Sequence, residues 1–144
     1  ADQLAREADF LSIGSNDLPQ YVLAMDRGNA ELAARLDGLH PAVLRLIGTV
    51  ATAGRRAGRS VSVCGGLASD PVAIPLLLGL GVRELSAVPK AVPTIKRCVR
   101  ELDLAQCEAL AEQALDCASA DEVRALLEAP DAGVELPRRS ASPH

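Results

Sequence analysis

The stretch DFLSIGSNDLPQYVLAMDRGN, residues 9–29, decides how the chain is interpreted. It begins with a short apolar run of strand length that stops at Gly14. A polar group at residues 15–17 follows, and after a run of helical character the stretch closes on D-R-G-N at residues 26–29. An amide, a carboxylate and a guanidinium just past a strand suit a site for a metal ion and an oxyanion. The carboxylate is a hard oxygen ligand for Mg²⁺, and arginine presents a planar fork matched to phosphate or carboxylate.

The same residues also have an ordinary structural interpretation. Asn16 and Asp17 are residue types that commonly cap helices and form turns after a strand, and residues 26–29 fit a charged turn. Residue types and spacing alone leave both interpretations open.

Outward from this stretch, the chain shows three units of a strand followed by a helix. Strands are predicted at about residues 9–13, 60–64 and 83–86. A short helical piece is predicted at 30–36 and a longer helix from Pro41 to about residues 56–58. Such alternation predicts a parallel sheet with right-handed crossovers.

Helix signals dominate the second half. Asp70 followed by Pro71 predicts the start of a helix that stops at Gly81. A further helix is predicted after Pro93, and the capping-box spacings that start at Asp103 and Ser119 predict two more.

Composition excludes several classes of protein. The 144 residues, 49% of them hydrophobic, suffice for one domain with an aliphatic core. A net charge of −4 without any basic, aromatic-rich stretch argues against nucleic-acid binding. We find no apolar run of membrane-spanning length and no N-terminal signal. The four cysteines form no C-x-x-C zinc pattern, so we expect reduced thiols in a cytoplasmic protein. The chain does not begin with Met, and we expect it to be a fragment.

Three motifs carry a resemblance to a known family. They are S-I-G-S-N-D-L-x-Q-Y-x-L-A-x-D-R-G-N at residues 12–29, C-G-G-L-A-S-D at 64–70 and L-G-L-G-V-x-E-L-S at 78–86. They closely resemble phosphoenolpyruvate-protein phosphotransferase, enzyme I of the bacterial phosphotransferase system, over about residues 9–129. The C-G-G form is similar to the fructose-type multiphosphoryl transfer proteins, in which enzyme I is fused to a carrier and a sugar-specific module. Enzymes such as pyruvate phosphate dikinase share the N-D pair and are the alternative family.

The resemblance implies an α/β fold. Residues 1–129 would form the last three strand–helix units of a phosphoenolpyruvate-binding (β/α)₈ TIM barrel plus C-terminal helices. The tail at 130–144 is polar and rich in Pro and Ser, and from this composition we expect it to be disordered. Three units cannot close a barrel of eight strands. We therefore expect the isolated chain to be an incomplete barrel with exposed sheet edges that persists as a homo-oligomer.

The resemblance also implies a function. The whole enzyme would move the phosphoryl group of phosphoenolpyruvate to one of its histidines and on to an HPr-type phosphocarrier for sugar uptake. The carrier would bind an N-terminal domain outside this chain, so we expect no turnover by the chain alone. The alternatives are a non-catalytic dimerisation or interaction module derived from the barrel, and a thiol-based sensor centred on Cys64.

By resemblance, four residues of this chain carry the chemistry. Asp17 matches the aspartate that binds Mg²⁺, Asn16 a substrate-contacting residue, and Arg27 an arginine that binds the phosphate. Cys64 matches the cysteine that gives a proton to the methylene carbon of enolpyruvate, a task that suits a thiol with an ordinary pKa near 8.5. Without the resemblance, a lone cysteine that ends a strand is more often an inert core residue.

The sequence departs from the family pattern beside Cys64 and within the first motif. Gly66 stands where the family commonly has Glu, Ser69 where it has Gly, and Pro19 where it has Thr. The first departure puts in doubt any hydrogen bond that the Glu would make behind the site.

Overall fold

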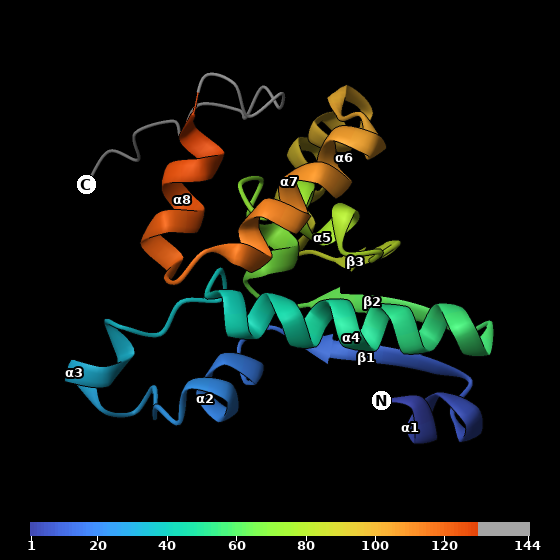
Figure 1. The fold of residues 1–144 in the computed structure, drawn as a ribbon, viewed down its shortest axis with the longest axis horizontal. Coiled ribbons are helices and arrows are strands. Elements are labelled where there is room, and N and C mark those ends of the chain that lie inside the picture. The colour runs from blue at the N-terminus through green and yellow to red at the C-terminus, as the bar shows by residue number, and fades with distance from the viewer. Residues whose placement is uncertain (130–144) are drawn as a thin grey trace.

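The computed structural model describes residues 1–129, and the predicted tail at 130–144 lies outside them (Figure 1). Within this range, strands β1 (Phe10–Gly14), β2 (Ser60–Cys64) and β3 (Glu84–Ser86) form one parallel sheet in the order β1-β2-β3. The register pairs Gly14 with Cys64 and Cys64 with Ser86. The carboxyl ends of all three strands therefore lie at one edge of the sheet.

Helices follow each strand, as the alternation predicted. They are α1 (Asp2–Glu7), α2 (Leu18–Leu23), α3 (Ala30–Ala33), α4 (Pro41–Ala57), α5 (Ile74–Gly79), α6 (Val92–Glu101), α7 (Leu104–Asp116) and α8 (Ala120–Glu128), with the 3₁₀ turns η1 (Leu67–Ser69) and η2 (Pro89–Ala91). None of these helices is long and apolar enough to span a membrane.

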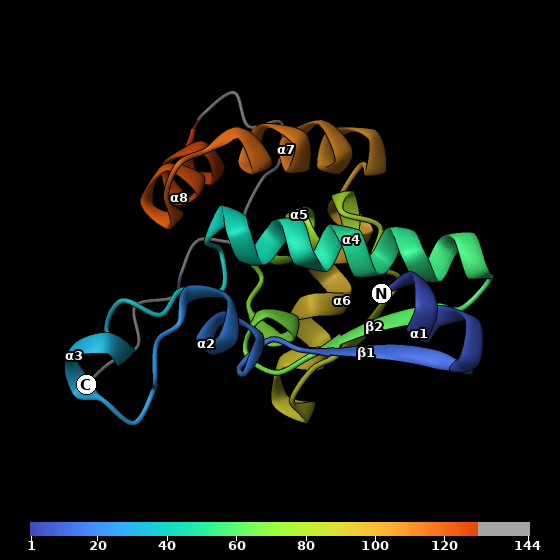
Figure 2. The ribbon, with the colours of Figure 1, turned by 60° about the horizontal axis from the view of Figure 1, so that its bottom comes forward.

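Alternation along the strands gives the sheet two different faces. Ile13, Val61 and Val63 are buried and belong to the core that includes α4. Ser12 and Cys64 lie at the alternate positions, where the side chains are small and more exposed. Figure 2 shows α4 lying along one face of the sheet, with α7 stacked beyond it.

The predicted bounds of α4 are confirmed, and so is the reason for them. His40 caps the helix by accepting from Ala42 N at its Nδ1 (3.2 Å), and Pro41 occupies the first turn, where a missing N–H costs nothing. Gly58 ends the helix with a positive φ of 67°, which glycine adopts without strain.

The predicted start of the next helix is wrong. Asp70 Oδ1 does accept a hydrogen bond from Val72 N (3.0 Å), but this closes a turn, and α5 begins only at Ile74. A helix that started at Pro71 would need the N–H of residue 75 to reach the Pro71 carbonyl. Pro75 has no N–H and instead fits the first turn of a helix that starts later.

Two further helix predictions are confirmed at their first residues. The side chain of Asp103 accepts from Gln106 N (3.0 Å) at the start of α7, and Ser119 Oγ accepts from Glu122 N (3.2 Å) at the start of α8. Both helices bury aliphatic residues in the common core, among them Leu110, Val123 and Leu127.

Helices α5 and α7 pack very closely at Gly79. A Cβ built on Gly79 would lie 2.0 Å from the carbonyl oxygen of Cys107 and 2.8 Å from the Ala111 Cβ. Both contacts are with atoms that cannot rotate away, so only glycine permits this packing.

We predict that Gly79→Ala lowers the free energy of unfolding by about 1–3 kcal/mol, since α5 and α7 must separate to admit the methyl group. Gly48→Ala is the matched control, because its added Cβ would meet only the flexible end of Leu80 at 3.3 Å. Urea unfolding followed by circular dichroism measures both. Equal stabilities for the two variants would contradict this account of the helix contact.

Candidate functional site

Ser15 joins the carboxyl ends of β1 and β2. Its backbone N–H donates to the carbonyl oxygen of Cys64 (3.0 Å), and its Oγ donates to the same oxygen (2.7 Å). The hydroxyl also accepts from Leu67 N (3.2 Å), and Ser15 is only 4% exposed. The buried Ser15 hydroxyl and the buried Leu67 N–H hydrogen-bond to each other. Ser15 therefore fixes the start of the first connection, residues 15–40 after β1, and of the second connection, residues 65–73 after β2.

Asn16 ties the first connection to the second. Its Oδ1 accepts a hydrogen bond from Gly66 N (2.9 Å). Gly65 has a positive φ of 91°, and a Cβ there would lie 2.8 Å from Ser15 Oγ and 2.9 Å from Asn16 Oδ1. Gly65, the first glycine of the C-G-G motif, is therefore required by its backbone conformation and by the close approach of Ser15 and Asn16.

Asp17 and Arg27 meet across the first connection. Arg27 Nη1 lies 3.4 Å from Asp17 Oδ1, and the two side chains are 62% and 61% exposed. Gln20 bridges them, since its Nε2 donates to Asp17 Oδ1 (3.3 Å) and its Oε1 accepts from Arg27 N (3.0 Å). An ion pair this exposed is worth about 0–1 kcal/mol, so a ligand can replace it at little cost.

A turn brings Arg27 back toward the sheet. Ala24 ends α2 in the left-handed region (φ 52°), and Asp26 Oδ1 accepts from Gly28 N (2.7 Å). Tyr21, on α2 between Asp17 and this turn, is 84% exposed. The chemistry-bearing part of the connection therefore lies at the surface.

Cys64 lies on the face of the sheet that carries small polar residues. Its Sγ is 3.6 Å from the Ile13 carbonyl oxygen and 4.0 Å from Ser12 Oγ, and the residue is half-buried. The thiol is therefore neither enclosed in the core nor part of the group formed by Asp17 and Arg27.

A cavity of about 590 Å³ opens beside the first connection. It is lined by residues from both connections and from α8: Ser15, Asn16, Pro19, Arg27, Ala33, Ala34, Leu36, Asp37, Gly38, Gly66, Leu67 and Arg124. Asp17 and Cys64 are not among them. The structure thus pairs Asp17 with Arg27 and links Asn16 to Gly66. Ser15 contacts Cys64 at the backbone carbonyl group of Cys64.

Sequence reasoning assigned no role to Ser15 or Gln20. A signal for Ser15 existed, because alternation from the buried Ile13 places it on the same face, where a hydroxyl needs partners. No local pattern indicates the other polar contact in this cavity, which joins Asp37 to Arg124.

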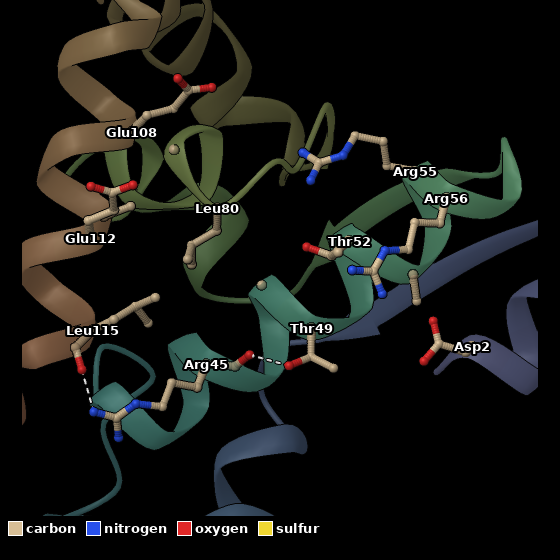
Figure 3. A pocket seen from close by; sticks show the side chains of 14 residues that line it. Asp2, Arg45, Thr49, Thr52, Arg55, Arg56, Leu80, Glu108, Glu112 and Leu115 are labelled. Carbon is tan, nitrogen blue, oxygen red and sulfur yellow. Dashed lines mark hydrogen bonds between the residues drawn. The ribbon is translucent and has the colours of Figure 1, made fainter.

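A larger groove of about 670 Å³ lies between α4 and α7, away from the strand ends (Figure 3). Figure 3 shows Arg55 and Arg56 on one side and Glu108 and Glu112 on the other. Since the lining mixes both signs of charge and includes none of the motif residues, we do not place the candidate site here.

Two cysteines of the helices, Cys98 and Cys107, are buried packing residues. Burial raises the pKa of the Cys98 thiol, with a smaller contribution from the negative charge of Glu101. Burial also raises the pKa of Cys107, which is fully buried beside α5. Both thiols therefore stay protonated and inert at neutral pH.

The chain is similar to known proteins over most of its length. Residues 1–104 match the family model described as "PEP-utilising enzyme, PEP-binding domain". The chain belongs to this family. It is 57% identical over 126 residues to the multiphosphoryl transfer protein of Xanthomonas campestris pv. campestris, an alignment that covers 88% of the chain and 15% of the relative.

Two other relatives of this PEP-binding domain extend the comparison. The multiphosphoryl transfer protein of Rhodobacter capsulatus is 52% identical over 126 residues, covering 88% of the chain and 15% of that protein. The "Phosphoenolpyruvate-dependent phosphotransferase system" protein of Escherichia coli is 42% identical over 121 residues, covering 84% and 16%. The chain thus spans about 15% of the length of these relatives, and the resemblance to enzyme I-containing proteins is confirmed.

We predict that Ser15→Ala lowers the free energy of unfolding by about 1–3 kcal/mol, because it leaves the buried Leu67 N–H without its acceptor. Ser12→Ala, which removes an exposed hydroxyl from the preceding strand β1, should change the free energy of unfolding by about 0.5 kcal/mol or less. Chemical unfolding of both variants measures the difference. Similar values for the two serines would refute the joining role of Ser15.

The two buried thiols predict a pH dependence of stability. Their pKa values are raised in the folded chain, whereas the unfolded thiols titrate near their ordinary value of about 8.5. The contribution of these two thiols to the free energy of unfolding is fully present below that pH. It is lost as the pH rises from there through the folded-state pKa values. Urea unfolding from about pH 7 to about pH 10 should show this decline, and a variant with both Cys98→Ala and Cys107→Ala should show less of it. An equal decline in the two proteins would show that other groups cause it.

Proposed function

We propose that residues 1–129 are part of a phosphoenolpyruvate-binding (β/α)₈ barrel of a phosphotransferase. The whole enzyme moves the phosphoryl group of phosphoenolpyruvate to an enzyme histidine and on to an HPr-type phosphocarrier that serves sugar uptake. The observation that carries the proposal is the group formed by Asn16, Asp17 and Arg27. It lies at the carboxyl ends of parallel strands, the edge where such barrels hold their active sites, in a chain of a PEP-binding family.

Arg27 is the proposed ligand of the phosphate group. Its guanidinium is largely exposed, and its fork geometry allows two parallel hydrogen bonds to phosphate oxygens. In the chain as described it faces Asp17, so an incoming phosphate competes with a carboxylate for the same group. The Arg27 backbone N–H donates to Gln20 Oε1 on α2, a contact that does not involve the guanidinium and so can persist when phosphate binds.

Asp17 is the proposed ligand for Mg²⁺. Its carboxylate is exposed and supplies hard oxygen atoms, which fits the ion. Mg²⁺ sites on phosphorylated substrates use one or two carboxylates together with the phosphate oxygens, and residues 1–129 contain no cluster of three metal-ligating side chains. We propose that a second carboxylate ligand comes from outside these residues. When bound, the ion would neutralise charge on the phosphate.

Cys64 is the proposed proton donor. Loss of the phosphoryl group from phosphoenolpyruvate leaves the enolate of pyruvate, and the Sγ proton moves to its methylene carbon, which leaves a thiolate that water reprotonates. Asn16 is the proposed substrate contact beside it. Cys64 lies on the small-residue face of the sheet, which is the face that would line the interior of a closed barrel.

The described sheet has an outer edge on β1 and another on β3, and Phe10 is 64% exposed at the first. Edges of this kind invite pairing with further strands. We infer that in the isolated chain they favour a homo-oligomer, and light scattering that shows a compact monomer would count against it. The four free cysteines fit the cytoplasm as the proposed location.

The open edges also favour a second candidate function, a non-catalytic dimerisation or interaction module. The two functions differ in what the rest of a longer relative would restore. Supplying the remaining strands in trans restores turnover if the chain is part of a split enzyme, and only association if it is a module.

We predict that this chain releases no pyruvate from phosphoenolpyruvate and Mg²⁺ alone, but does so with the preceding portion of a multiphosphoryl transfer protein in trans. In the complemented enzyme, Cys64→Ala should slow pyruvate release by about 10²–10⁴-fold. Arg27→Ala should weaken substrate binding by at least about tenfold, as the loss of hydrogen bonds to a charged group does. Asp17→Asn should raise the Mg²⁺ concentration needed.

Arg35→Ala is the matched control, since Arg35 is an exposed arginine of the same connection. Turnover by the isolated chain would overturn the prediction of inactivity. Full activity of Cys64→Ala and Arg27→Ala in the complemented enzyme would overturn the assigned roles.

A further inference from the structure

One side chain from the C-terminal part of the described chain reaches the cavity beside Arg27. Arg124 of α8 donates from Nε (3.1 Å) and Nη2 (2.7 Å) to Oδ2 of Asp37. Two donors of one guanidinium on one carboxylate oxygen fix orientation as well as distance. The side chains are 36% and 24% exposed, so this pair is better shielded from water than the pair between Asp17 and Arg27.

Asp37 anchors the end of the connection that carries Arg27. Its other oxygen, Oδ1, accepts from Leu39 N (2.9 Å), and Leu39 is buried in the core. Gly38 packs so closely that a Cβ there would lie 2.9 Å from Leu67 Cδ2. Leu67 is itself tied to Ser15 through its N–H, so the end of the connection is joined to the strand ends.

The rest of this connection has little burial of its own. No residue from 20 to 38 is buried, although Val22 and Leu23 of α2 are partly buried and pack against the core. Figures 1 and 2 show α3 lying farther from the sheet than α2 does. Segments with few buried contacts have low local stability. The position of Arg27, which lies between α2 and α3, therefore depends on how the connection is held by α2 on one side and at Asp37 on the other.

The helix that supplies Arg124 does not need this ion pair to stay in place. Val123 and Leu127 bury α8 in the core, and both views show it standing over the start of α4, where the connection ends. Because the core holds α8 in place without the ion pair, the ion pair acts mainly to restrain Asp37.

We propose that Arg124 is a positioning residue for the candidate site. It holds Asp37, and through the end of the connection it restricts where Arg27 can stand. The consequence for substrate rests on the proposed function of Arg27. Residue 124 lies beyond residue 104, where the family match ends, so this role is not part of what the match describes.

The first test is hydrogen exchange on the full chain and does not involve substrate. The Leu39 N–H donates to the Asp37 side chain, and the His40 N–H donates to the Asp37 backbone carbonyl. The N–H groups of Arg35 and Leu36 donate to backbone carbonyls of the same connection. In Arg124→Gln, exchange over residues 33–40 should be about fivefold faster, the effect of losing about 1 kcal/mol, with exchange in α7 and the melting temperature unchanged. Arg124→Lys should restore part of the protection.

Matched variants separate this role from a general loss of charge. Arg35→Gln removes an exposed arginine of the same connection and should leave exchange at residues 33–40 as in the original chain. Asp37→Asn should resemble Arg124→Gln, and the double variant should add little to either. Unchanged exchange in Arg124→Gln, or an equal rise across α7 and α8, overturns the proposal.

The second test uses the complemented enzyme. Arg124→Gln should raise KM for phosphoenolpyruvate by about fivefold with little change in kcat, because a displaced Arg27 weakens binding without touching the proton donor. An unchanged KM overturns the link to Arg27. If the original chain shows no turnover even when complemented, the proposed function fails, and the exchange experiment still decides whether Arg124 holds the connection.

Discussion

The carbonyl oxygen of Cys64 accepts two hydrogen bonds from Ser15, and the arrangement of the site depends on this junction. It holds the ends of β1 and β2 in register at the point where each turns into its connection. Asn16 and Gly66 can meet only because the strands stop side by side. A parallel sheet thereby brings together two motifs about fifty residues apart without requiring any contact between their reactive side chains.

The candidate site has an inner part and an exposed part. The inner part consists of Ser15, Gly65 and Leu67, where Ser15 and Leu67 share a buried hydrogen bond and Gly65 has a positive φ and close contacts that exclude a side chain. The exposed part carries Asp17 and Arg27 in an ion pair that is open to water, and no residue from 20 to 38 is buried. The two groups proposed to bind ligands thus lie where an internal partner can be replaced at little cost in free energy, and the residues that fix the geometry lie closer to the core.

Much of the fold follows from local sequence signals, and the failures have physical causes. The strand at 60–64 and the helix that begins at Pro41 were predictable because an apolar run, a proline and a left-handed glycine mark them directly. The helix expected at Pro71 was misplaced because a second proline four residues later moves its start. The shared edge of the two motifs was predictable from topology. The pairing of Asp37 with Arg124 was not, since the partners are separated by 87 residues and neither belongs to a recognisable pattern.

The scarcity of aromatic residues gives this chain an optical property. It contains no tryptophan and a single tyrosine, Tyr21, which stands 84% exposed on α2 between the proposed metal ligand and the proposed phosphate ligand. With excitation at wavelengths that phenylalanine does not absorb, emission from the unlabelled protein therefore arises at Tyr21 alone, and the aliphatic interior contributes nothing to it. The molecule carries its own reporter of local events there, free of background from the folding of the core.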